Sequence, residues 1–439
     1  MRRELPLSNS ASQSLTITPA ARPVRGRIRP PGSKSITNRA LVCAALAEGT
    51  SALTGALDSE DTQVMIDSLG RLGIRVESKG EGQTLIVHGC GGKIPVSSAD
   101  LFVGNSGTTI RFLTALCALG HGTYRLDGIE RMRERPIGDL LDALNQLGAD
   151  CRGELKGGFP PVIVRANGLR GGQVTIRGDI SSQFLSGLMM AAPYAVGDIT
   201  VSVSSELVSK PYVAMTQQIM ESFGASYKTG FTIPAPQIYQ PRNYAIEPDA
   251  SAASYFWAAA AITGGQVTVE GLAKDSLQGD VAFVECLAQM GCHVTCSDDS
   301  ITVSGRAEQG IAVDMNAISD TVQTLAAVAL FANGPTTIRG VAHIRHKETD
   351  RIGDLARELR KFGAEVGELP DGLRITPPAD IWRRRDITIE TYHDHRMAMS
   401  LGLPGLVLPG ITILNPGCTA KTYPRFFDDL ASLSSSDSV

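Results

Sequence analysis

The sequence predicts an α/β protein made of two domains, and three observations support this prediction. The chain repeats one pattern six times, the central helix of each repeat is apolar on every side, and strand-like runs separate the helices. A helix that is apolar all round is a buried one, whereas a single apolar stripe makes a surface helix. Strand–helix–strand–helix–strand–strand units of this kind predict inner helices enclosed by sheets and outer helices.

The six central helices share one composition. Each begins polar, becomes Ala-rich and apolar, and ends near a glycine; the stretches are residues 35–49, 107–122, 181–197, 249–264, 319–334 and 394–410. An amphipathic helix that closes on a glycine follows in five repeats. These closing glycines are Gly73, Gly148, Gly224, Gly291 and Gly363, at intervals of 75, 76, 67 and 72 residues. Such regular spacing indicates a true internal repeat.

The pattern predicts that the first strand and the last repeat belong to the same unit. The sixth repeat reaches the C-terminus without its closing strands, while an isolated strand-like run, residues 15–20, resembles residues 372–378. We infer that the first strand completes the last repeat. One domain then comprises residues 1–32 and 247–439, and the other, residues 33–246, is inserted into it, with three repeats in each.

The composition argues against several classes of protein. With 45 acidic and 41 basic residues, a net charge of −4, the chain lacks the basic field that nucleic-acid binding needs. No uncharged apolar run is long enough to cross a membrane. Eight scattered cysteines without a Cys-x-x-Cys pair suggest reduced thiols. We therefore expect a cytoplasmic monomer that binds neither nucleic acid nor membrane.

Polar residues of the central helices gather at the helix starts. Free N–H groups and the helix dipole make such a start favourable for anions. Capping accounts for the Ser, Thr and Asp residues there, but not for the cations Lys34, Arg39, Arg111 and Arg396. If the helix starts face one cleft, that cleft is a site for several anions.

Two helix starts partly match familiar ligand-binding motifs. Residues 31–35 resemble the end of a nucleotide-binding P-loop, but the required glycine spacing is missing, so ATP is not predicted. His393 and His395 are two residues apart and do not share a helix face, which favours an orienting role over a metal site.

Nine segments, in order along the chain, resemble the 5-enolpyruvylshikimate-3-phosphate synthase family of enolpyruvyl transferases. They are PGSKSITNRAL (31–41), GNSGTTIR (104–111), RMRERPI (131–137), SSQFLSGLMM (181–190), ELVSKPY (206–212), EPDASAASYF (247–256), KETDRI (347–352), DHRMAM (394–399) and GCTAKTYP (417–424). The resemblance implies a two-domain inside-out barrel, each domain containing three βαβαββ repeats around buried parallel helices.

The resemblance also implies a reaction. The family transfers the enolpyruvyl (carboxyvinyl) group of phosphoenolpyruvate to the 5-hydroxyl of shikimate 3-phosphate and releases phosphate, by addition and elimination in an interdomain cleft. This step belongs to the shikimate pathway, which leads to chorismate and the aromatic amino acids. The resemblance implies no metal and no organic cofactor. It implies inhibition by glyphosate, which resembles phosphoenolpyruvate, with Gly107 leaving room for it.

Site residues follow from the matching motifs. Phosphoenolpyruvate is expected at Lys34, Asn105, Gly107, Arg135, Gln183, Arg351, Arg396 and Lys421. Shikimate 3-phosphate is expected at Lys34, Ser35, Arg39, Ser181, Ser182, Gln183, Ser209, Tyr212, Asp320 and Lys347. Both substrates carry a phosphate and a carboxylate, which the forked guanidinium of Arg binds well.

The catalytic residues are expected among the same motifs. Asp320 is the candidate base for the hydroxyl, and Glu348 is the candidate proton donor to C3 of phosphoenolpyruvate, a role that requires a pKa raised by burial. Lys34 and Lys421 are expected to stabilise the departing phosphate. Lys347 and His395 are alternative proton carriers.

The sequence departs from the family motifs at two positions, and two other functions are alternatives. His343 stands where the family has an asparagine, and Phe112 where many members have proline. The sister transferase that acts on UDP-N-acetylglucosamine has Lys-Asn in place of Lys34-Ser35 and a loop cysteine that the arginine-rich segment 130–136 lacks. A repeat scaffold would instead present exposed patches for partner proteins.

Overall fold

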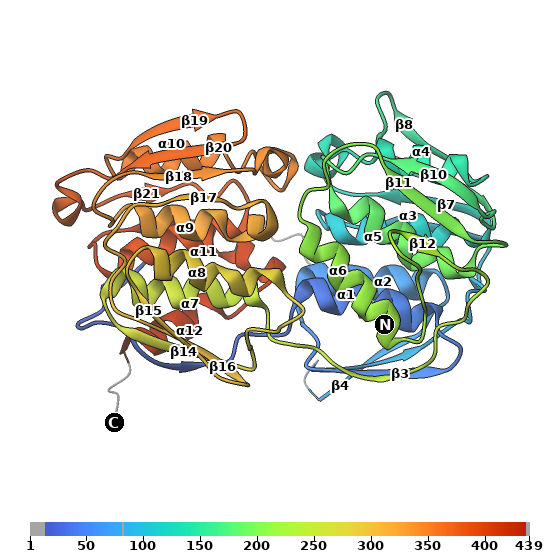
Figure 1. The fold of residues 1–439 in the computed structure, drawn as a ribbon, viewed down its shortest axis with the longest axis horizontal. Helices are drawn as coiled ribbons and strands as arrows, with labels where there is room; N and C mark the ends of the chain where they lie inside the picture. The colour runs from blue at the N-terminus through green and yellow to red at the C-terminus, as the bar shows by residue number, and fades with distance from the viewer. Residues whose placement is uncertain (1–13, 81–82, 436–439) are drawn as a thin grey trace.

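The computed structural model describes residues 14–80 and 83–435. Within them the chain forms two halves that lie side by side, with helices inside and sheets around them (Figure 1). Buried hydrophobic side chains make two separate clusters. One contains residues from Ile36 to Ile246, and the other joins Ile17 and Val24 to residues from Ala250 to Leu433. The protein is therefore mixed α/β, as the sequence predicted.

Six helices occupy the interior of the two halves. They are α1 (Lys34–Leu46), α3 (Gly107–Cys117) and α5 (Ser182–Ala191) in one half, and α7 (Ala250–Thr263), α9 (Val322–Ala329) and α11 (His395–Gly402) in the other. Nearly all their residues are buried, and every residue of α7 is. Such helices are stabilised mainly by packing against their neighbours.

Several of these helices are shorter than the apolar stretches suggested. α5 gives way to a 3₁₀ turn, Ala192–Tyr194, that contains Pro193, and α11 gives way to Leu403–Leu406, which contains Pro404. Proline lacks the N–H that an α-helix needs at these positions. α9 begins only at Val322, because residues Asn316–Thr321 form a separate 3₁₀ turn with a kink at Ile318.

Six further helices have one buried and one exposed face. They are α2 (Glu60–Arg71), α4 (Gly138–Gln146), α6 (Lys210–Ser222), α8 (Phe283–Gln289), α10 (Gly353–Lys361) and α12 (Phe426–Ser435). The first five of these helices end just before a closing glycine. Those five glycines all have a positive φ, from 81° to 108°. That backbone conformation favours glycine, which explains its regular recurrence.

The strands of the described residues form six small sheets. Four of them run in the orders β13-β3-β5-β4, β6-β7-β9-β8, β15-β16-β14-β2 and β17-β18-β20-β19, and two have three strands, β10-β11-β12 and β1-β22-β21. Each four-stranded sheet combines one parallel and two antiparallel pairs. In the last sheet Ser14 pairs with Leu414, so strands from both ends of the described chain share one sheet.

The strand bounds in the first half are β3 (Thr50–Thr54), β4 (Val76–Lys79), β5 (Thr84–His88), β6 (Ser98–Phe102), β7 (His121–Asp127), β8 (Asp150–Leu155), β9 (Phe159–Asn167), β10 (Gly172–Ile176), β11 (Ile199–Val203), β12 (Thr232–Ile233) and β13 (Asn243–Ala245). The remaining bounds are β1 (Ser14–Thr16), β2 (Arg25–Ile28), β14 (Gln266–Glu270), β15 (His293–Cys296), β16 (Ser300–Ser304), β17 (Ala312–Asp314), β18 (Thr336–Arg339), β19 (Glu365–Leu369), β20 (Gly372–Thr376), β21 (Thr388–Ile389) and β22 (Thr412–Leu414).

Two segments cross between the halves and pair with each other. The N–H of Ser33 donates to the carbonyl of Glu247 (2.8 Å), and the N–H of Asp249 donates to the carbonyl of Pro31 (2.8 Å). Gly32 forms an antiparallel bridge with Pro248. These pairings fix the start of α1 beside the start of α7.

We expect Gly32→Ala to destabilise this crossing. A Cβ at Gly32 would lie 1.9 Å from the carbonyl oxygen of Gly55, a backbone atom that cannot turn away. We predict a loss of about 2 kcal/mol or more in the free energy of unfolding, as for other forced overpacking. Urea denaturation measures this change.

Gly70→Ala is the matched control for that measurement. Gly70 lies on the exposed side of α2, and no atom lies within 4 Å of the added Cβ. Alanine in an exposed helix position should add up to about 1 kcal/mol of stability. An unfolding midpoint of Gly32→Ala equal to that of the wild type would contradict the steric argument.

Candidate active site

The first turns of the buried helices meet in the cleft between the halves, where residues from both surround two small adjoining hollows. We call the first the hydroxyl hollow; it is lined by Lys34, Ser35, Thr108, Ser181, Ser182, Gln183, Val208, Ser209, Tyr212, Ser319, Asp320, His343 and Lys347. We call the second the cation hollow; it is lined by Lys34, Asp61, Gly107, Thr108, Arg135, Gln183, Asp320, Lys347, Glu348, Arg351 and Arg396.

Local backbone structure places the hydroxyls of the hydroxyl hollow. Ser181 caps α5 by accepting a hydrogen bond from the N–H of Gln183 (3.3 Å). Ser209 has a positive φ of 53° just before α6, and its N–H donates to the side chain of Asn316 in the other half (2.9 Å). A positive φ is uncommon for serine and marks a conformation that its surroundings impose. The result is a ring of hydroxyls that suits a polyhydroxylated, phosphorylated ligand.

Arg351 and Asp320 form the centre of the cation hollow. Arg351, 1% exposed, donates from Nε to Asp394 Oδ2 (2.7 Å) and from Nη2 to Glu348 Oε2 (2.8 Å). Asp320 accepts from Arg396 Nη2 (2.7 Å) and lies 3.4 Å from Arg351 Nη1 and 4.0 Å from Lys347 Nζ.

A fourth carboxylate, Asp61, closes the hollow from the first half. Lys421 Nζ, in the second half, donates to Asp61 Oδ1 (2.7 Å) and to the carbonyl of Asn105 (2.9 Å), and Lys34 Nζ lies 3.7 Å from Asp61 Oδ2. Together the cations are Lys34, Arg135, Lys347, Arg351, Arg396 and Lys421, and the carboxylates are Asp61, Asp320, Glu348 and Asp394. Six positive charges against four negative ones leave an excess that attracts anions.

These charges shift the pKa values of the central carboxyls. Burial acts to raise the pKa of Glu348, but the attraction of Arg351, Arg135 and Lys421 outweighs it and holds the pKa well below its ordinary value. The raised pKa that we expected for Glu348 is therefore wrong for this arrangement of charges. Asp320 behaves alike: burial opposes ionisation, yet Arg396, Lys347 and Arg351 hold its pKa low.

The pKa values of the basic groups of the site are lowered as well, chiefly by burial. Burial lowers the pKa of Lys347 to about 8, with Arg351 adding to the effect and Asp320 opposing it. Burial and the charge of Arg396 keep the pKa of His395 well below its ordinary value, so this imidazole is neutral. Lys347 therefore exchanges a proton close to neutral pH.

Comparison with known proteins shows the family. The model of the EPSP synthase family (3-phosphoshikimate 1-carboxyvinyltransferase) matches residues 19–430. The chain belongs to the EPSP synthase family. Proteins named 3-phosphoshikimate 1-carboxyvinyltransferase are 51% identical in Nostoc punctiforme, over 92% of this chain and 96% of that one, and 46% identical in a Marinomonas species, over 94% and 98%.

Other matches extend the similarity to plants and to solved structures. A chloroplastic 3-phosphoshikimate 1-carboxyvinyltransferase of Arabidopsis thaliana is 47% identical over 97% of this chain and 85% of that one. A solved EPSP synthase from Acinetobacter baumannii superimposes with a TM-score of 0.77 and 27% identity, covering 97% of this chain and 98% of that one. The family predicted from the nine sequence motifs is confirmed.

The structure brings most of the predicted EPSP synthase residues into the two hollows, with four exceptions. Asn105 and Lys421 stand just outside: the side chain of Asn105 accepts from Arg135 Nη1 (3.1 Å), and Lys421 contacts Asp61. His395 is fully buried, with no hydrogen-bond partner for either ring nitrogen among the described residues. Arg39 is 1% exposed and donates to Thr216, Ser186 and the carbonyls of Ser35 and Tyr212.

Sequence reasoning missed four lining residues: Asp61, Thr108, Val208 and Ser319. Asp61 lies in the first turn of an amphipathic helix, α2, where an acidic residue is ordinary and gives no signal of a ligand. Val208 carries no polar group. Thr108 belongs to the polar start of a central helix and Ser319 precedes Asp320, but neither was assigned to a ligand.

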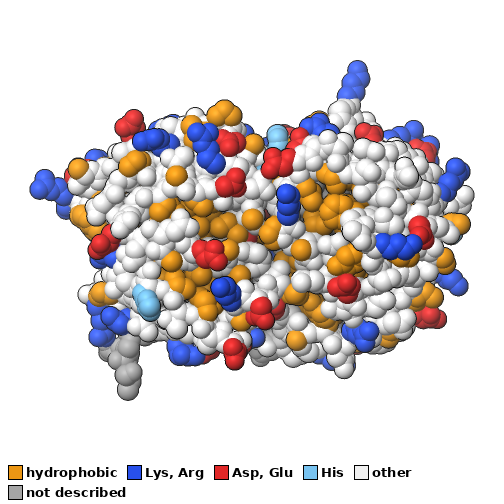
Figure 2. All heavy atoms as spheres, in the orientation of Figure 1, with side chains coloured by type: hydrophobic (Ala, Val, Ile, Leu, Met, Phe, Trp, Pro, Cys, Tyr) orange, Lys and Arg blue, Asp and Glu red, His pale blue; other side chains and the backbone are white. Residues whose placement is uncertain are grey.

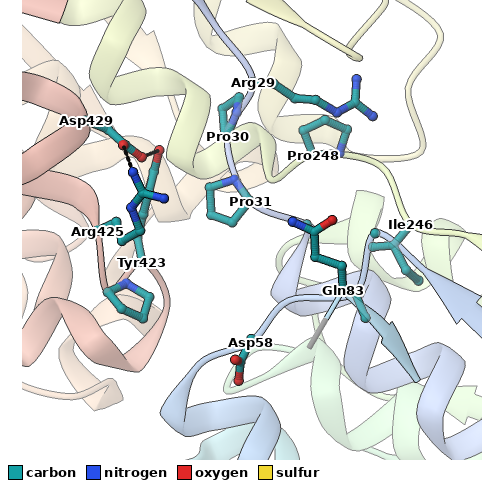
Figure 3. A pocket seen from close by; sticks show the side chains of 14 residues that line it. Arg29, Pro30, Pro31, Asp58, Gln83, Ile246, Pro248, Tyr423, Arg425 and Asp429 are labelled. Atoms are coloured by element: carbon teal, nitrogen blue, oxygen red, sulfur yellow. Dashed lines mark hydrogen bonds and ion pairs between the residues drawn. The ribbon is translucent and has the colours of Figure 1, made fainter. Parts of the chain in front are cut away.

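The rest of the described surface lies outside the two hollows and differs from them. Charged side chains of both signs are scattered over the face in Figure 2, with hydrophobic side chains between them. A wider groove of about 550 Å³ beside the crossing segments shares no residue with either hollow (Figure 3). Among residues 14–80 and 83–435, no helix is long and apolar enough to cross a membrane, and no group of three His, Cys, Asp or Glu side chains could hold a metal ion.

Proposed function

We propose that the chain transfers the carboxyvinyl group of phosphoenolpyruvate to the 5-hydroxyl of shikimate 3-phosphate and releases phosphate. The observation that carries this proposal is the convergence of six cations from both halves on one cleft, directly beside a ring of hydroxyls. Two ligands that each bear a phosphate and a carboxylate need this combination. The family membership and the names of the relatives support the same reaction.

The cation hollow suits phosphoenolpyruvate. Arg351 and Arg396 would bind its carboxylate, and Lys34 and Arg135 its phosphate, with Gln183 beside them. Gly107 opens the first turn of α3 there, because a Cβ would lie 2.4 Å from Arg135 Nη2. Lys421 and Asn105 complete the group from the edge of the hollow, and Asn105 orients Arg135.

The hydroxyl hollow suits shikimate 3-phosphate. Ser181, Ser182 and Gln183 at the start of α5 would bind its phosphate, as a helix N-terminus favours. Ser35, Ser209, Tyr212, Asp320 and Lys347 surround the place left for the ring. For Arg39, a positioning role fits better than direct contact, because its donors are taken by Ser35, Tyr212 and their neighbours.

The chemistry is an addition followed by an elimination. C3 of phosphoenolpyruvate gains a proton while the 5-hydroxyl attacks C2 and gives up its own proton. The tetrahedral adduct then loses phosphate from C2 and a proton from C3, which restores the double bond. Asp320, between the two hollows, would accept the hydroxyl proton. Lys34, which lines both, would stabilise the phosphate as it leaves.

Which group donates the proton to C3 depends on the charges that surround Glu348. Glu348 is ionised while Arg351, Arg135 and Lys421 hold its pKa low. Anionic ligands on those cations would offset this attraction, so that burial would raise the pKa of Glu348 and let it carry a proton. Lys347, with a pKa of about 8, is the alternative donor. His395, kept neutral, would serve to orient its neighbours.

We also propose the finer architecture. Residues 33–246 would be one domain, and residues 1–32 with 247–439 the other, each an inside-out barrel of three βαβαββ repeats; residues 1–13 and 436–439 lie outside the described structure. The two hydrophobic clusters and the paired crossing segments support this division. The proposal extends to a cytoplasmic monomer that uses no metal or organic cofactor and binds neither nucleic acid nor membrane.

Phosphate release by the purified protein tests the function. Phosphoenolpyruvate with shikimate 3-phosphate should release phosphate, whereas phosphoenolpyruvate with UDP-N-acetylglucosamine should not. Lys34→Met should lower kcat by about 100-fold or more, since it removes charge that faces the departing group, and should leave the unfolding midpoint nearly unchanged. The absence of phosphate release with both acceptors would overturn the proposal.

The affinity for shikimate 3-phosphate should fall at alkaline pH. Lys347 is protonated below its pKa of about 8 and loses its charge as the pH rises through that value. We therefore predict that the Kd rises about tenfold between pH 7.5 and 9.5, where the phosphate stays dianionic. Titration calorimetry measures it.

Lys347→Arg is the control for this pH dependence. A guanidinium stays charged over the whole range, so the Kd of this variant should stay constant even if its absolute value differs. A wild-type Kd as independent of pH as that of Lys347→Arg would exclude Lys347 as the titrating group.

Gly107→Ala should selectively weaken the binding of phosphoenolpyruvate. The new methyl group would displace the guanidinium of Arg135, the flexible end of a side chain, without disturbing the hydroxyl hollow. We predict that the KM for phosphoenolpyruvate rises about tenfold, the loss of one charge-assisted contact, and that glyphosate inhibits less. The KM for shikimate 3-phosphate should change less than about twofold. Equal changes in both KM values would refute this assignment.

A further inference from the structure

Asp280 is a buried carboxyl next to the hydroxyl hollow that the reaction as derived above does not use. It lies in a 3₁₀ turn, Gly279–Ala282, of the second half and is 3% exposed. Its Oδ2 accepts from Tyr212 Oη (3.0 Å) and from Ser251 Oγ, whereas its Oδ1 has no partner among the described residues. A buried carboxyl with one orphan oxygen needs an explanation.

This carboxyl reaches across the cleft. Tyr212 belongs to α6 in the first half, and the turn that holds Asp280 packs against the start of that helix: a Cβ at Gly279 would lie 2.5 Å from Pro211 Cβ. Leu277 of the same segment packs on the hydrophobic cluster of the first half. The contact is thus built by close packing and not by a single side chain.

Tyr212 has a second acceptor within reach. Its Oη lies 3.5 Å from Asp320 Oδ2, but a tyrosine hydroxyl has one proton to donate. The shorter contact to Asp280 takes that proton. Asp320, which also lines the hydroxyl hollow, then keeps Arg396 as its close partner and retains acceptor capacity toward the hollow.

We propose that Asp280 is a positioning residue for the shikimate 3-phosphate site: it holds the hydroxyl of Tyr212 and thereby leaves Asp320 free for the substrate hydroxyl. The inference rests on the proposed function. Its chemistry is consistent with a neutral acid, because burial and the nearby charge of Asp320 raise the pKa of Asp280 to about 7. A proton on Oδ1 would leave Oδ2 as a carbonyl-type acceptor for two hydroxyls, as observed.

Steady-state kinetics of Asp280→Ala test this role. Without its acceptor, Tyr212 would donate to Asp320, so we expect the KM for shikimate 3-phosphate to rise about tenfold and kcat to fall, as for one lost hydrogen bond. The KM for phosphoenolpyruvate should stay within about twofold. Asp280→Asn, which keeps an acceptor oxygen for Tyr212, should restore the KM for shikimate 3-phosphate to within about threefold of the wild-type value.

The background Tyr212→Phe makes the test specific. If Asp280 acts through the tyrosine hydroxyl, Asp280→Ala should change the KM for shikimate 3-phosphate far less in Tyr212→Phe than in the wild type. Asp429→Ala is the matched control, since Asp429 accepts from another tyrosine, Tyr423 Oη (2.7 Å), away from both hollows. It should alter stability without altering that KM.

The outcomes separate the two proposals. A wild type that releases no phosphate overturns the proposed function and this inference with it. An active wild type overturns the inference alone if Asp280→Ala leaves the KM for shikimate 3-phosphate unchanged, raises both KM values equally, or has the same effect in Tyr212→Phe. If the alanine variant does not fold, Asp280→Ser replaces it, because its shorter side chain leaves Tyr212 without an acceptor.

Discussion

The structure depends on holding many like charges in one cleft. Six cations converge there, at the same place as the positive ends of buried helices. Left alone, such a group would repel itself and force the halves apart, because buried charges are costly without partners. Four carboxylates, Asp61, Asp320, Glu348 and Asp394, lie between the cations and balance most of the charge. The remaining excess of positive charge attracts an anionic ligand.

That balance makes the proton chemistry depend on the ligands. Asp320 and Glu348 are held ionised by their cations, so neither is a strong base or a neutral acid in this arrangement. A bound phosphate or carboxylate competes for the same guanidinium and ammonium groups, and the carboxyl pKa values then move back toward the values that burial favours. Acid–base capability would therefore appear only with both substrates in place, which protects phosphoenolpyruvate from reaction with water.

Much of the fold and of the candidate site could be predicted from the sequence, for physical reasons that differ between residues. The buried helices and their starts were predictable because apolar periodicity and polar first turns are local signals, and this placed Lys34, Ser181 and Arg396. The place of Asp61 in the site and the lowered pKa of Glu348 were not predictable. Both depend on contacts between residues far apart in the sequence, such as Lys421 and Asp61, which are 360 positions apart. The early ends of α5 and α11 were readable from Pro193 and Pro404 but were overlooked.

The paired crossing segments explain how two halves can share one charge balance. Asp249 caps α7 by accepting from the N–H of Ala252 (2.9 Å), and its other oxygen accepts from the N–H of Lys34 (3.0 Å), the first residue of α1. One carboxylate thus satisfies free N–H groups of two helices, one from each half. This shared carboxylate holds the starts of α1 and α7 together. It thereby fixes Lys34, the first residue of α1, at the place where this residue lines both hollows.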